Sequence, residues 1–431
     1  MATTQSSAPS QGLTPVDSSV ASPTAAYVHI PFCRRRCYYC DFAVSIVGNR
    51  PPVAITSELA PEQTDGHGSQ AIAAYLDVLC EEIEATPKGP PLQTLFFGGG
   101  TPSLLSSQQL ERLLAVLARQ FGIAQGAEIS IEVDPDTVRD GMLARYREMG
   151  INRVSLGVQA FQDELLTACG RTHRRRHIDY ALGQLHRAGL TNVSLDLISG
   201  LPHQTLDQWT ESLQRAIATG VPHLSVYDLI VEPQTAFSRW YSPGEHPLPS
   251  DTATVQMYRQ AQALLTQAGY EHYEISNYAK PGFQCRHNRV YWENRPFYGF
   301  GMGAASYIQQ QRVTRPRTQV AYRAWVRDRL SQRTACPDSL TERLLDTLML
   351  GLRLSEGLSL RKLVRAFGSD LVHGVTRAMA PFYAKGWVIY GPDDRFRLSD
   401  PDGFLFSNVI LSTLFDTVSA ASDSDADDLP D

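Results

Sequence analysis

The sequence has no long apolar run and few cysteines, and both absences limit what the protein can be. Across its 431 residues no stretch of about eighteen apolar residues occurs, so no transmembrane segment is expected. Seven cysteines, unevenly spaced, are too few for the disulfide framework of a secreted protein. We therefore expect a cytoplasmic protein whose thiols stay reduced.

A strong positive charge is also absent. The formal net charge is −6, whereas a protein that binds nucleic acid normally presents a basic face, so no nucleic-acid partner is expected. The first residues, rich in Ser, Thr, Ala and Pro, lack the apolar core of a secretory signal and the arginines of a transit peptide. We expect a disordered N-terminal tail at residues 1–24 and an acidic disordered tail at residues 416–431.

What the sequence does contain is a repeated alternation of strand-like and helix-like segments. "TLFFGG" reads as a buried strand that ends in glycines, and "SSQQLERLLAVLARQF" has leucines at helical spacing. About six such units are visible, fewer than the eight of a complete barrel. The pattern predicts an α/β protein with a partial (β/α)6 TIM-like barrel over residues 25–335 and an active site at the carboxyl ends of its strands.

The alternation stops after about residue 310. Residues 336–415 read as two helices, a short β-hairpin and a further helix, which predicts a small C-terminal winged-helix-like domain. Such units often bind DNA, but this one has no strong basic face. We therefore expect it to serve in packing or in contact with a partner.

Three cysteines lie in one short segment, "CRRRCYYC", at Cys33, Cys37 and Cys40. Thiolates select zinc, copper or iron–sulfur clusters. A structural zinc site needs four ligands, and a disulfide would leave one thiol unpaired. A 4Fe–4S cluster on three cysteines keeps one iron open, able to chelate the amino and carboxylate groups of S-adenosylmethionine. We predict that cluster; zinc, or three reduced surface thiols, are the alternatives.

This segment and its surroundings resemble the radical S-adenosylmethionine (radical SAM) superfamily. "YVHIPFC" matches the lead-in to its cluster, and "FFGGGTPS" matches its glycine-rich turn. Within the superfamily the chain resembles the oxygen-independent, anaerobic coproporphyrinogen III oxidase family, from about Tyr27 to Arg397. The resemblance implies a radical SAM barrel that carries a 4Fe–4S cluster and S-adenosylmethionine.

The resemblance also implies which residues bind S-adenosylmethionine. The residues at the matching positions are Tyr27, Tyr39, Gly99, Gly100, Thr101, Glu132, Gln159, Arg171, Asp196 and Ile230. Their chemistry suits the ligand, because a sulfonium nucleoside needs a cation for its carboxylate and acceptors for its hydroxyl groups. Glycines let the backbone approach a ligand closely.

Two features separate the branches of this family. Position 42 holds Phe42, where the dehydrogenases carry a further cysteine, and "HNRVYW" matches the HNxxYW motif of the heme-chaperone branch. In that branch the motif is associated with heme, which implies heme contact at His287, Asn288, Tyr291 and Trp292. A neutral imidazole is the usual protein ligand of heme iron, and the aromatic rings could stack on a porphyrin.

These features predict a heme chaperone, a carrier without coproporphyrinogen dehydrogenase activity. It would bind heme and transfer it to an unidentified heme-acceptor protein. The alternative is an oxygen-independent coproporphyrinogen III dehydrogenase, which oxidatively decarboxylates propionate side chains by radical chemistry. The sequence leaves open peripheral membrane contact during delivery, cleavage of S-adenosylmethionine, the atom that ligates heme, and the oligomeric state.

Overall fold

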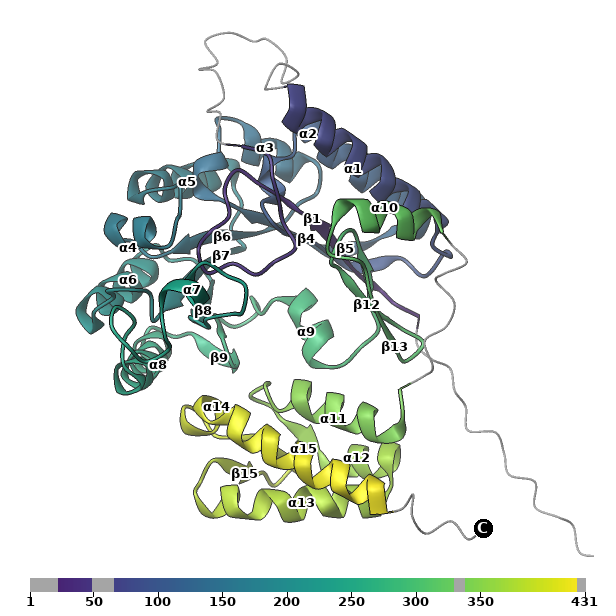
Figure 1. Cartoon of the computed structure of the whole chain (residues 1–431), viewed down its shortest axis with the longest axis vertical. Coiled ribbons are helices and arrows are strands. Elements are labelled where there is room, and N and C mark those ends of the chain that lie inside the picture. The colour runs from purple at the N-terminus through teal and green to yellow at the C-terminus, as the bar shows by residue number, and fades with distance from the viewer. Residues whose placement is uncertain (1–21, 49–65, 329–337, 425–431) are drawn as a thin grey trace, which may run out of the picture.

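The computed structural model describes residues 22–48, 66–328 and 338–424 and arranges them in two lobes (Figure 1). The larger lobe is a sheet covered by helices, and the smaller lobe, green to yellow, lies beneath it in Figure 1. Most of the expected N-terminal tail and the last seven residues of the acidic tail lie outside the described residues. Within the described part of the chain, no helix has the length and apolar character needed to cross a membrane.

The larger lobe is built on one sheet that has nine strands among the described residues, in the order β11-β1-β4-β5-β6-β7-β8-β10-β9. Every pairing from β11 to β8 is parallel, and β10 pairs antiparallel with both β8 and β9. The strands are β1 (Ala25–Ile30), β4 (Leu92–Gly99), β5 (Ile123–Val133), β6 (Arg153–Gln159), β7 (Val193–Ser199), β8 (His223–Asp228), β9 (Glu271–Glu274), β10 (Asn277–Ala279) and β11 (Tyr298–Phe300). The run β1, β4, β5, β6, β7, β8 confirms the predicted six-strand parallel unit.

Helices connect successive parallel strands and bury one face against the sheet. Before the helix over residues 107–121, Ser106 Oγ accepts a hydrogen bond from the Gln109 backbone N–H, and Gln109 Oε1 accepts one from the Ser106 backbone N–H. This capping box fixes where the helix begins. Its buried face is apolar: Leu110, Leu113, Leu114, Val116, Leu117 and Phe121. The helices of this layer are α1 (Gly66–Ala85), α2 (Ser107–Phe121), α3 (Met142–Glu148), α4 (Asp163–Ala168), α5 (Arg175–Ala188), α6 (Leu206–Ala218) and α8 (Asp251–Gln267).

Short elements lie at the two ends of the barrel. At the carboxyl ends of the strands lie β2 (Phe32–Cys33), β3 (Ser45–Ile46) and the turn α7 (Phe237–Trp240). At the amino ends lies α9 (Arg286–Trp292), which contacts β4 and packs Val290 against Ala25 at the start of β1. Further along the chain are β12 (Ala305–Ile308), β13 (Gln311–Thr314) and α10 (Gln319–Arg327).

The smaller lobe has its own hydrophobic core. Its order is α11 (Leu340–Gly351), β14 (Leu358–Ser359), α12 (Leu360–Phe367), α13 (Ser369–Ala384), β15 (Val388–Tyr390), β16 (Arg395–Leu398), α14 (Asp402–Leu405) and α15 (Ser407–Ser424). The helices and the β-hairpin agree with the predicted winged-helix-like domain, but three helices precede the hairpin where two were expected. The expected start of the acidic tail, at residue 416, falls inside α15, because Leu414 and Val418 remain buried in this core.

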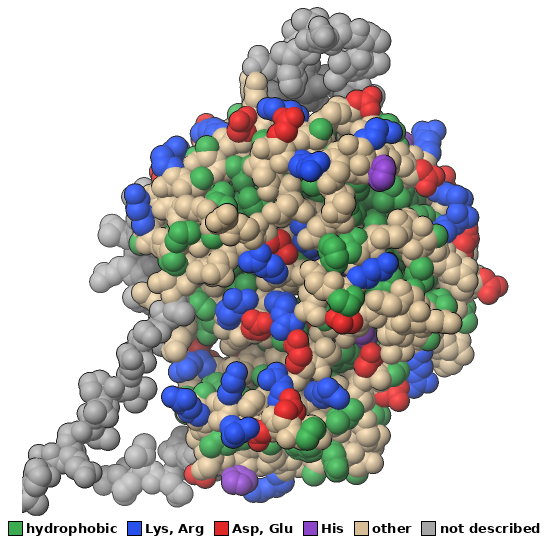
Figure 2. All heavy atoms as spheres, turned by 180° about the vertical axis from the view of Figure 1, so that it is seen from behind, with side chains coloured by type: hydrophobic (Ala, Val, Ile, Leu, Met, Phe, Trp, Pro, Cys, Tyr) green, Lys and Arg blue, Asp and Glu red, His purple; other side chains and the backbone are tan. Residues whose placement is uncertain are grey.

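Polar contacts join the two lobes. Backbone bonds of 3.0 Å run from Ile275 N to Arg353 O and from Ser355 N to Tyr273 O. Ion pairs add Arg259–Asp402 and Arg312–Asp346, both at 2.9 Å. Figure 2 shows Lys and Arg side chains gathered around this junction, with Asp and Glu among them. The junction therefore carries charges of both signs beside an apolar contact, in which Tyr258 and Ile275 pack against the core of the smaller lobe.

Candidate functional site

A cavity of about 370 Å³ opens at the carboxyl ends of the parallel strands. Gly99, Val133, Gln159 and Asp228 are the last residues of β4, β5, β6 and β8, and all four line it. The cavity, called the cofactor pocket below, lies at the end of the barrel where the alternation predicts an active site.

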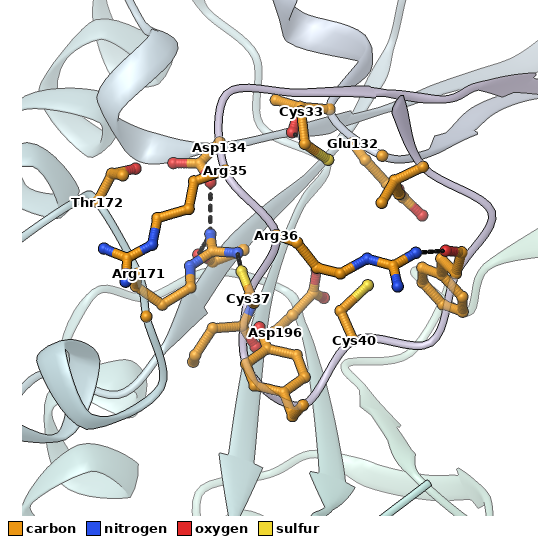
Figure 3. A pocket seen from close by; sticks show the side chains of 18 of the residues that line it. Cys33, Arg35, Arg36, Cys37, Cys40, Glu132, Asp134, Arg171, Thr172 and Asp196 are labelled. Carbon is orange, nitrogen blue, oxygen red and sulfur yellow. Dashed lines mark hydrogen bonds and ion pairs between the residues drawn. The ribbon is translucent and has the colours of Figure 1, made fainter. Parts of the chain in front are cut away.

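The three clustered cysteines come to this pocket on a single loop. Cys33 ends β2, and Cys37 and Cys40 follow before β3, whose parallel pairing with β2 closes the loop. All three are half-buried and line the pocket, and their sulfur atoms turn toward a common space (Figure 3). The loop therefore presents three soft donors to one cavity.

Without a bound metal, the deprotonated form of these thiols is unfavourable. Burial raises the pKa of the Cys33 thiol to about 12 and also raises the pKa of Cys40, and the neighbouring thiols add to both shifts. Thiolates crowded in this way need a positive charge beside them, so the donor set fits an iron–sulfur cluster. Among the described residues, no three His, Cys, Asp or Glu side chains are placed around a single metal ion.

Two buried carboxylates face the pocket beside the cysteine loop. Glu132 accepts a 3.0 Å hydrogen bond from the Gly99 backbone, and Asp196 accepts bonds of 2.9 and 3.0 Å from Ser155 Oγ. Burial, together with the nearby Asp196, raises the pKa of Glu132 to about 7, and burial raises that of Asp196. Crowded carboxylates favour a bound cation or hydroxyl donors, both of which S-adenosylmethionine offers.

Arg171 is already engaged in an ion pair. Its Nη2 lies 2.6 Å from Asp134 Oδ2, and its Nη1 donates to Cys37 Sγ at 3.5 Å. Although burial opposes ionisation, the guanidinium holds the pKa of Asp134 well below its usual range. Sequence reasoning missed Asp134, although it follows Glu132 by two residues in "IEVDPD", at the end of a strand. The pair places a positive group between the cluster loop and the strand ends.

The glycine-rich turn is shaped by close contacts. A Cβ on Gly100 would lie 2.8 Å from Phe32 O and from Pro31 C, so only glycine fits there. Gly99 has φ +117°, a region that glycine adopts without strain. Of the residues predicted to bind S-adenosylmethionine, all but Tyr27 line the pocket: Tyr39, Gly99, Gly100, Thr101, Glu132, Gln159, Arg171, Asp196 and Ile230.

Tyr27 is half-buried and is not among the residues that line the pocket. Its hydroxyl is 3.1 Å from His29 Nδ1, and its ring stacks on Phe96 at 6.2 Å between centroids. A Cβ on Gly98 would lie 2.9 Å from the Tyr27 ring and 3.0 Å from Glu132 Oε1. Contact between Tyr27 and S-adenosylmethionine therefore stays a prediction.

The HNxxYW residues lie at the opposite end of the barrel. His287 is fully buried, with Nδ1 2.9 Å from Thr94 Oγ1 and Nε2 2.8 Å from the Tyr291 hydroxyl. Its ring stacks on Phe96 at 5.3 Å, and burial lowers its pKa to about 3. The imidazole is thus neutral, but both nitrogens already have protein partners.

Buried contacts also hold the rest of this motif. Glu128 accepts hydrogen bonds from the backbone of Arg286 at 3.1 Å and of His287 at 3.0 Å, which satisfies the first turn of α9. Asn288, Tyr291 and Trp292 are half-buried, and the Arg353 guanidinium lies 5.8 Å from the centre of the Trp292 ring. The structure does not bring these residues to the cofactor pocket; residues 285–292 form a plug, called the α9 plug below.

Comparisons with known proteins agree with both lobes. The radical SAM superfamily model matches residues 27–216, and the HemN C-terminal domain model matches residues 338–405. The chain is 46% identical to the heme chaperone HemW of Synechocystis sp., across 91% of this chain and 96% of the relative. It is 32% identical to HemW of Lactococcus lactis, across 92% and 98%.

A solved structure is similar along the same length. The coproporphyrinogen III oxidase HemN of Escherichia coli, a radical SAM enzyme, superposes with a TM-score of 0.75 at 25% identity, covering 91% of this chain and 90% of that one. The sequence relatives and the fold thus point to one group. The chain belongs to the HemW heme-chaperone family of the radical SAM superfamily.

Proposed function

We propose that this chain binds heme and transfers it to an acceptor protein, while it holds a 4Fe–4S cluster on Cys33, Cys37 and Cys40 and an exchangeable S-adenosylmethionine. One observation carries the proposal: the 46% identity with a heme chaperone extends over nearly the whole of both chains. The clustered thiols and strand-end carboxylates around one pocket support the cofactor part of it. We place the protein in the cytoplasm, where its thiols stay reduced.

Different residues of the pocket would bind different parts of the cluster and of S-adenosylmethionine. When bound, the cluster supplies a reducing electron and one iron position open to the amino and carboxylate groups of S-adenosylmethionine. Glu132 and Asp196 supply negative charge and acceptors for the sulfonium and the ribose hydroxyl groups. The backbone from Gly99 to Thr101 approaches the ligand closely because that turn carries no side chain until Thr101.

Arg171 has two tasks in this arrangement. Its contact with Cys37 Sγ places positive charge beside a cluster ligand, and its pairing with Asp134 fixes the guanidinium in one orientation. A carboxylate that enters the pocket then meets a guanidinium that is already positioned. Binding is therefore less costly in side-chain entropy than with a free arginine.

A second candidate function is oxygen-independent coproporphyrinogen III dehydrogenation. It is favoured by the likeness to coproporphyrinogen III oxidase HemN over nine-tenths of both chains. Against it stands Phe42, where the dehydrogenases of the family carry a further cysteine; here the side chain is 58% exposed at the pocket. We infer that the scaffold is shared and that the reaction is not.

Heme contact through His287, Asn288, Tyr291 and Trp292 remains part of the proposal as one candidate site. For the His287 imidazole to ligate iron, the α9 plug must open, because both ring nitrogens are engaged and the ring is fully buried. That opening would break the bonds to Thr94 and Tyr291. The acceptor protein, and peripheral contact with a membrane during delivery, are not specified by these residues.

One experiment separates the two functions. The protein is reconstituted with its cluster under anaerobic conditions, reduced, and given S-adenosylmethionine with either hemin or coproporphyrinogen III. We expect stoichiometric hemin uptake and no decarboxylation. Formation of protoporphyrinogen with release of carbon dioxide would overturn the carrier function, and failure to take up hemin would do so as well.

A further inference from the structure

The segment between the first two clustered cysteines consists of three arginines, and two of them are not neutralised. Arg34 pairs with Asp136 at 3.5 Å. Arg35 and Arg36 are exposed, line the pocket, and have no ion pair with a carboxylate among the described residues. Arg36 donates to the Phe42 carbonyl at 2.8 Å, and Arg35 donates to the Tyr38 hydroxyl. Neither of these two positive charges at the pocket is therefore neutralised by a carboxylate of the described residues, and Figure 3 shows Arg36 with its hydrogen bond to a carbonyl.

Large apolar side chains are exposed beside these charges. Phe42 and Ile230 line the same pocket and are 58% and 66% exposed. The Arg35 guanidinium lies 5.0 Å from the centre of the Tyr38 ring, which in turn packs edge-on against Trp240 at 4.8 Å. Grouped exposed apolar side chains at a cavity mark a binding surface. We call Arg35, Arg36, Phe42 and Ile230, with Tyr38 and Trp240 beside them, the mouth surface.

We propose that the mouth surface is the docking site for heme, with the propionates paired to Arg35 and Arg36 and a porphyrin face against Phe42 and Ile230. The inference rests on the proposed function, since it names where that cargo sits. Heme is a flat apolar ring with two carboxylates on one edge. Guanidinium groups pair with carboxylates, and the neighbouring apolar side chains cover the ring.

The arginines at the other end of the barrel fit this ligand less well. A cavity of about 210 Å³ beside the α9 plug is lined by Arg286, Arg289 and Arg295. Two of these charges are already neutralised: Arg289 pairs with Glu293 and Glu356 at 2.9 and 3.0 Å, and Arg295 pairs with Glu293 at 2.8 Å. Val290 is the one large apolar side chain that lines it. The free charge and the exposed apolar area both favour the mouth surface.

The test compares hemin with hemin dimethyl ester, which keeps the ring and lacks the propionate charges. Binding to cluster-loaded, anaerobic protein is followed by quenching of tryptophan fluorescence. We expect R35A/R36A to weaken hemin binding by about tenfold and to leave ester binding unchanged, because exposed guanidinium–carboxylate pairs contribute modestly. R286A/R295A, which removes two arginines at the other end, is the matched control and should bind both ligands as the unmodified protein does.

A second variant tests the apolar part of the mouth surface, and an iron measurement detects any loss of the cluster. Phe42→Ser leaves the charges in place and should weaken hemin and its ester alike; iron content is measured for each variant. Unchanged hemin affinity in both R35A/R36A and Phe42→Ser, or a loss confined to R286A/R295A, would overturn the mouth surface as the docking site. If the unmodified protein itself takes up no hemin, the proposed function fails instead, so the two failures are distinguishable.

Discussion

The two ends of the barrel differ in how well the protein itself satisfies their buried polar groups. At the amino ends of the strands, His287 bonds to Thr94 and Tyr291, and Glu128 accepts from the first turn of α9. At the carboxyl ends Arg171 pairs with Asp134, but like groups also crowd together: thiols lie beside thiols, and Glu132 lies beside Asp196. Satisfied groups stabilise the fold, whereas crowded groups of one charge are stabilised by a ligand. The amino end of the barrel is therefore closed by its own contacts, whereas the carboxyl end is suited to a bound ligand. We call them the locked end and the receptor end.

The largest effect should come from removing one thiol at the receptor end. In Cys37→Ser we expect complete loss of cluster absorbance and bound iron, because a serine oxygen is a poor ligand for this soft site. Iron analysis and the visible spectrum after anaerobic reconstitution measure this. Cys80→Ser is the control, since Cys80 packs in α1 outside the pocket and should keep the cluster. A full cluster in Cys37→Ser would contradict the ligand assignment.

At the locked end, His287→Ala should destabilise the fold and leave the cluster in place. It removes a ring packed on Phe96 and leaves two buried hydroxyls, those of Thr94 and Tyr291, without their partner. We expect a loss of about 3 kcal/mol in the free energy of unfolding, measured by urea titration. His186→Ala serves as the control, because His186 is exposed.

Hemin titration of folded His287→Ala sharpens the comparison further. The HNxxYW resemblance predicts weaker hemin binding, whereas docking at the mouth surface predicts an affinity close to that of the unmodified protein. We expect the second result. A large loss of hemin affinity, with the cluster and the fold intact, would move heme to the α9 plug.

The crowded carboxylates predict a pH dependence at the receptor end. The pKa of Glu132 is raised from 4.5 to about 7, so the carboxylate gains a proton below neutral pH and no longer attracts the sulfonium. Affinity for S-adenosylmethionine should fall by up to about tenfold per pH unit below that value. Glu132→Gln should bind more weakly with a flat pH profile, and Glu111→Gln on α2 is the control. An unchanged pH profile in Glu132→Gln would assign the dependence to another group.

The raised pKa of Glu132 has the opposite effect on the stability of the ligand-free protein, which falls as the pH rises. Because the folded pKa of Glu132 is raised, its contribution is fully present below pH 4.5 and is lost as the pH rises through about 7. The ligand-free protein should therefore lose about 1–3 kcal/mol of unfolding free energy over that interval, and Glu132→Gln should remove this loss. Urea titrations at several pH values check it.

The smallest effect should come from the ion pair that ties the α9 plug to the smaller lobe. Arg289 and Glu356 are 23% and 44% exposed and 3.0 Å apart, so solvent screens the attraction. A double-mutant cycle with R289A and E356A should give a coupling of at most about 1 kcal/mol. A coupling several times larger would mean that the lobe holds the plug closed.

The sequence predicted which residues meet at the receptor end because the signals there are local. Cysteine spacing, the glycine-rich turn and polar residues at strand ends need only the alternation of strands and helices to be brought together. Asp134 was missed although it lies in the same segment as Glu132, because its role appears only when Arg171 folds onto it. Contact between Tyr27 and the cofactor stays a prediction, because Tyr27 does not line the pocket in the structure.

The locked end could not be predicted in the same way. The burial of His287 depends on Thr94 and Glu128, which lie more than 150 residues away along the chain. Nothing in "HNRVYW" itself indicates that the helix enters the barrel rather than staying exposed. The continuation of α15 past residue 416 likewise accompanies the burial of Leu414 and Val418 in the smaller lobe, which an acidic composition does not reveal.

The cluster loop hangs between two-residue strands, while the carboxylates around it belong to the long parallel strands. The pairing of the long parallel strands therefore does not depend on the cysteine loop. We expect the proposed cluster to be inserted into an already folded barrel, through a loop that lies at its surface. A shortage of iron would then leave an inactive but intact reserve of protein, ready for loading.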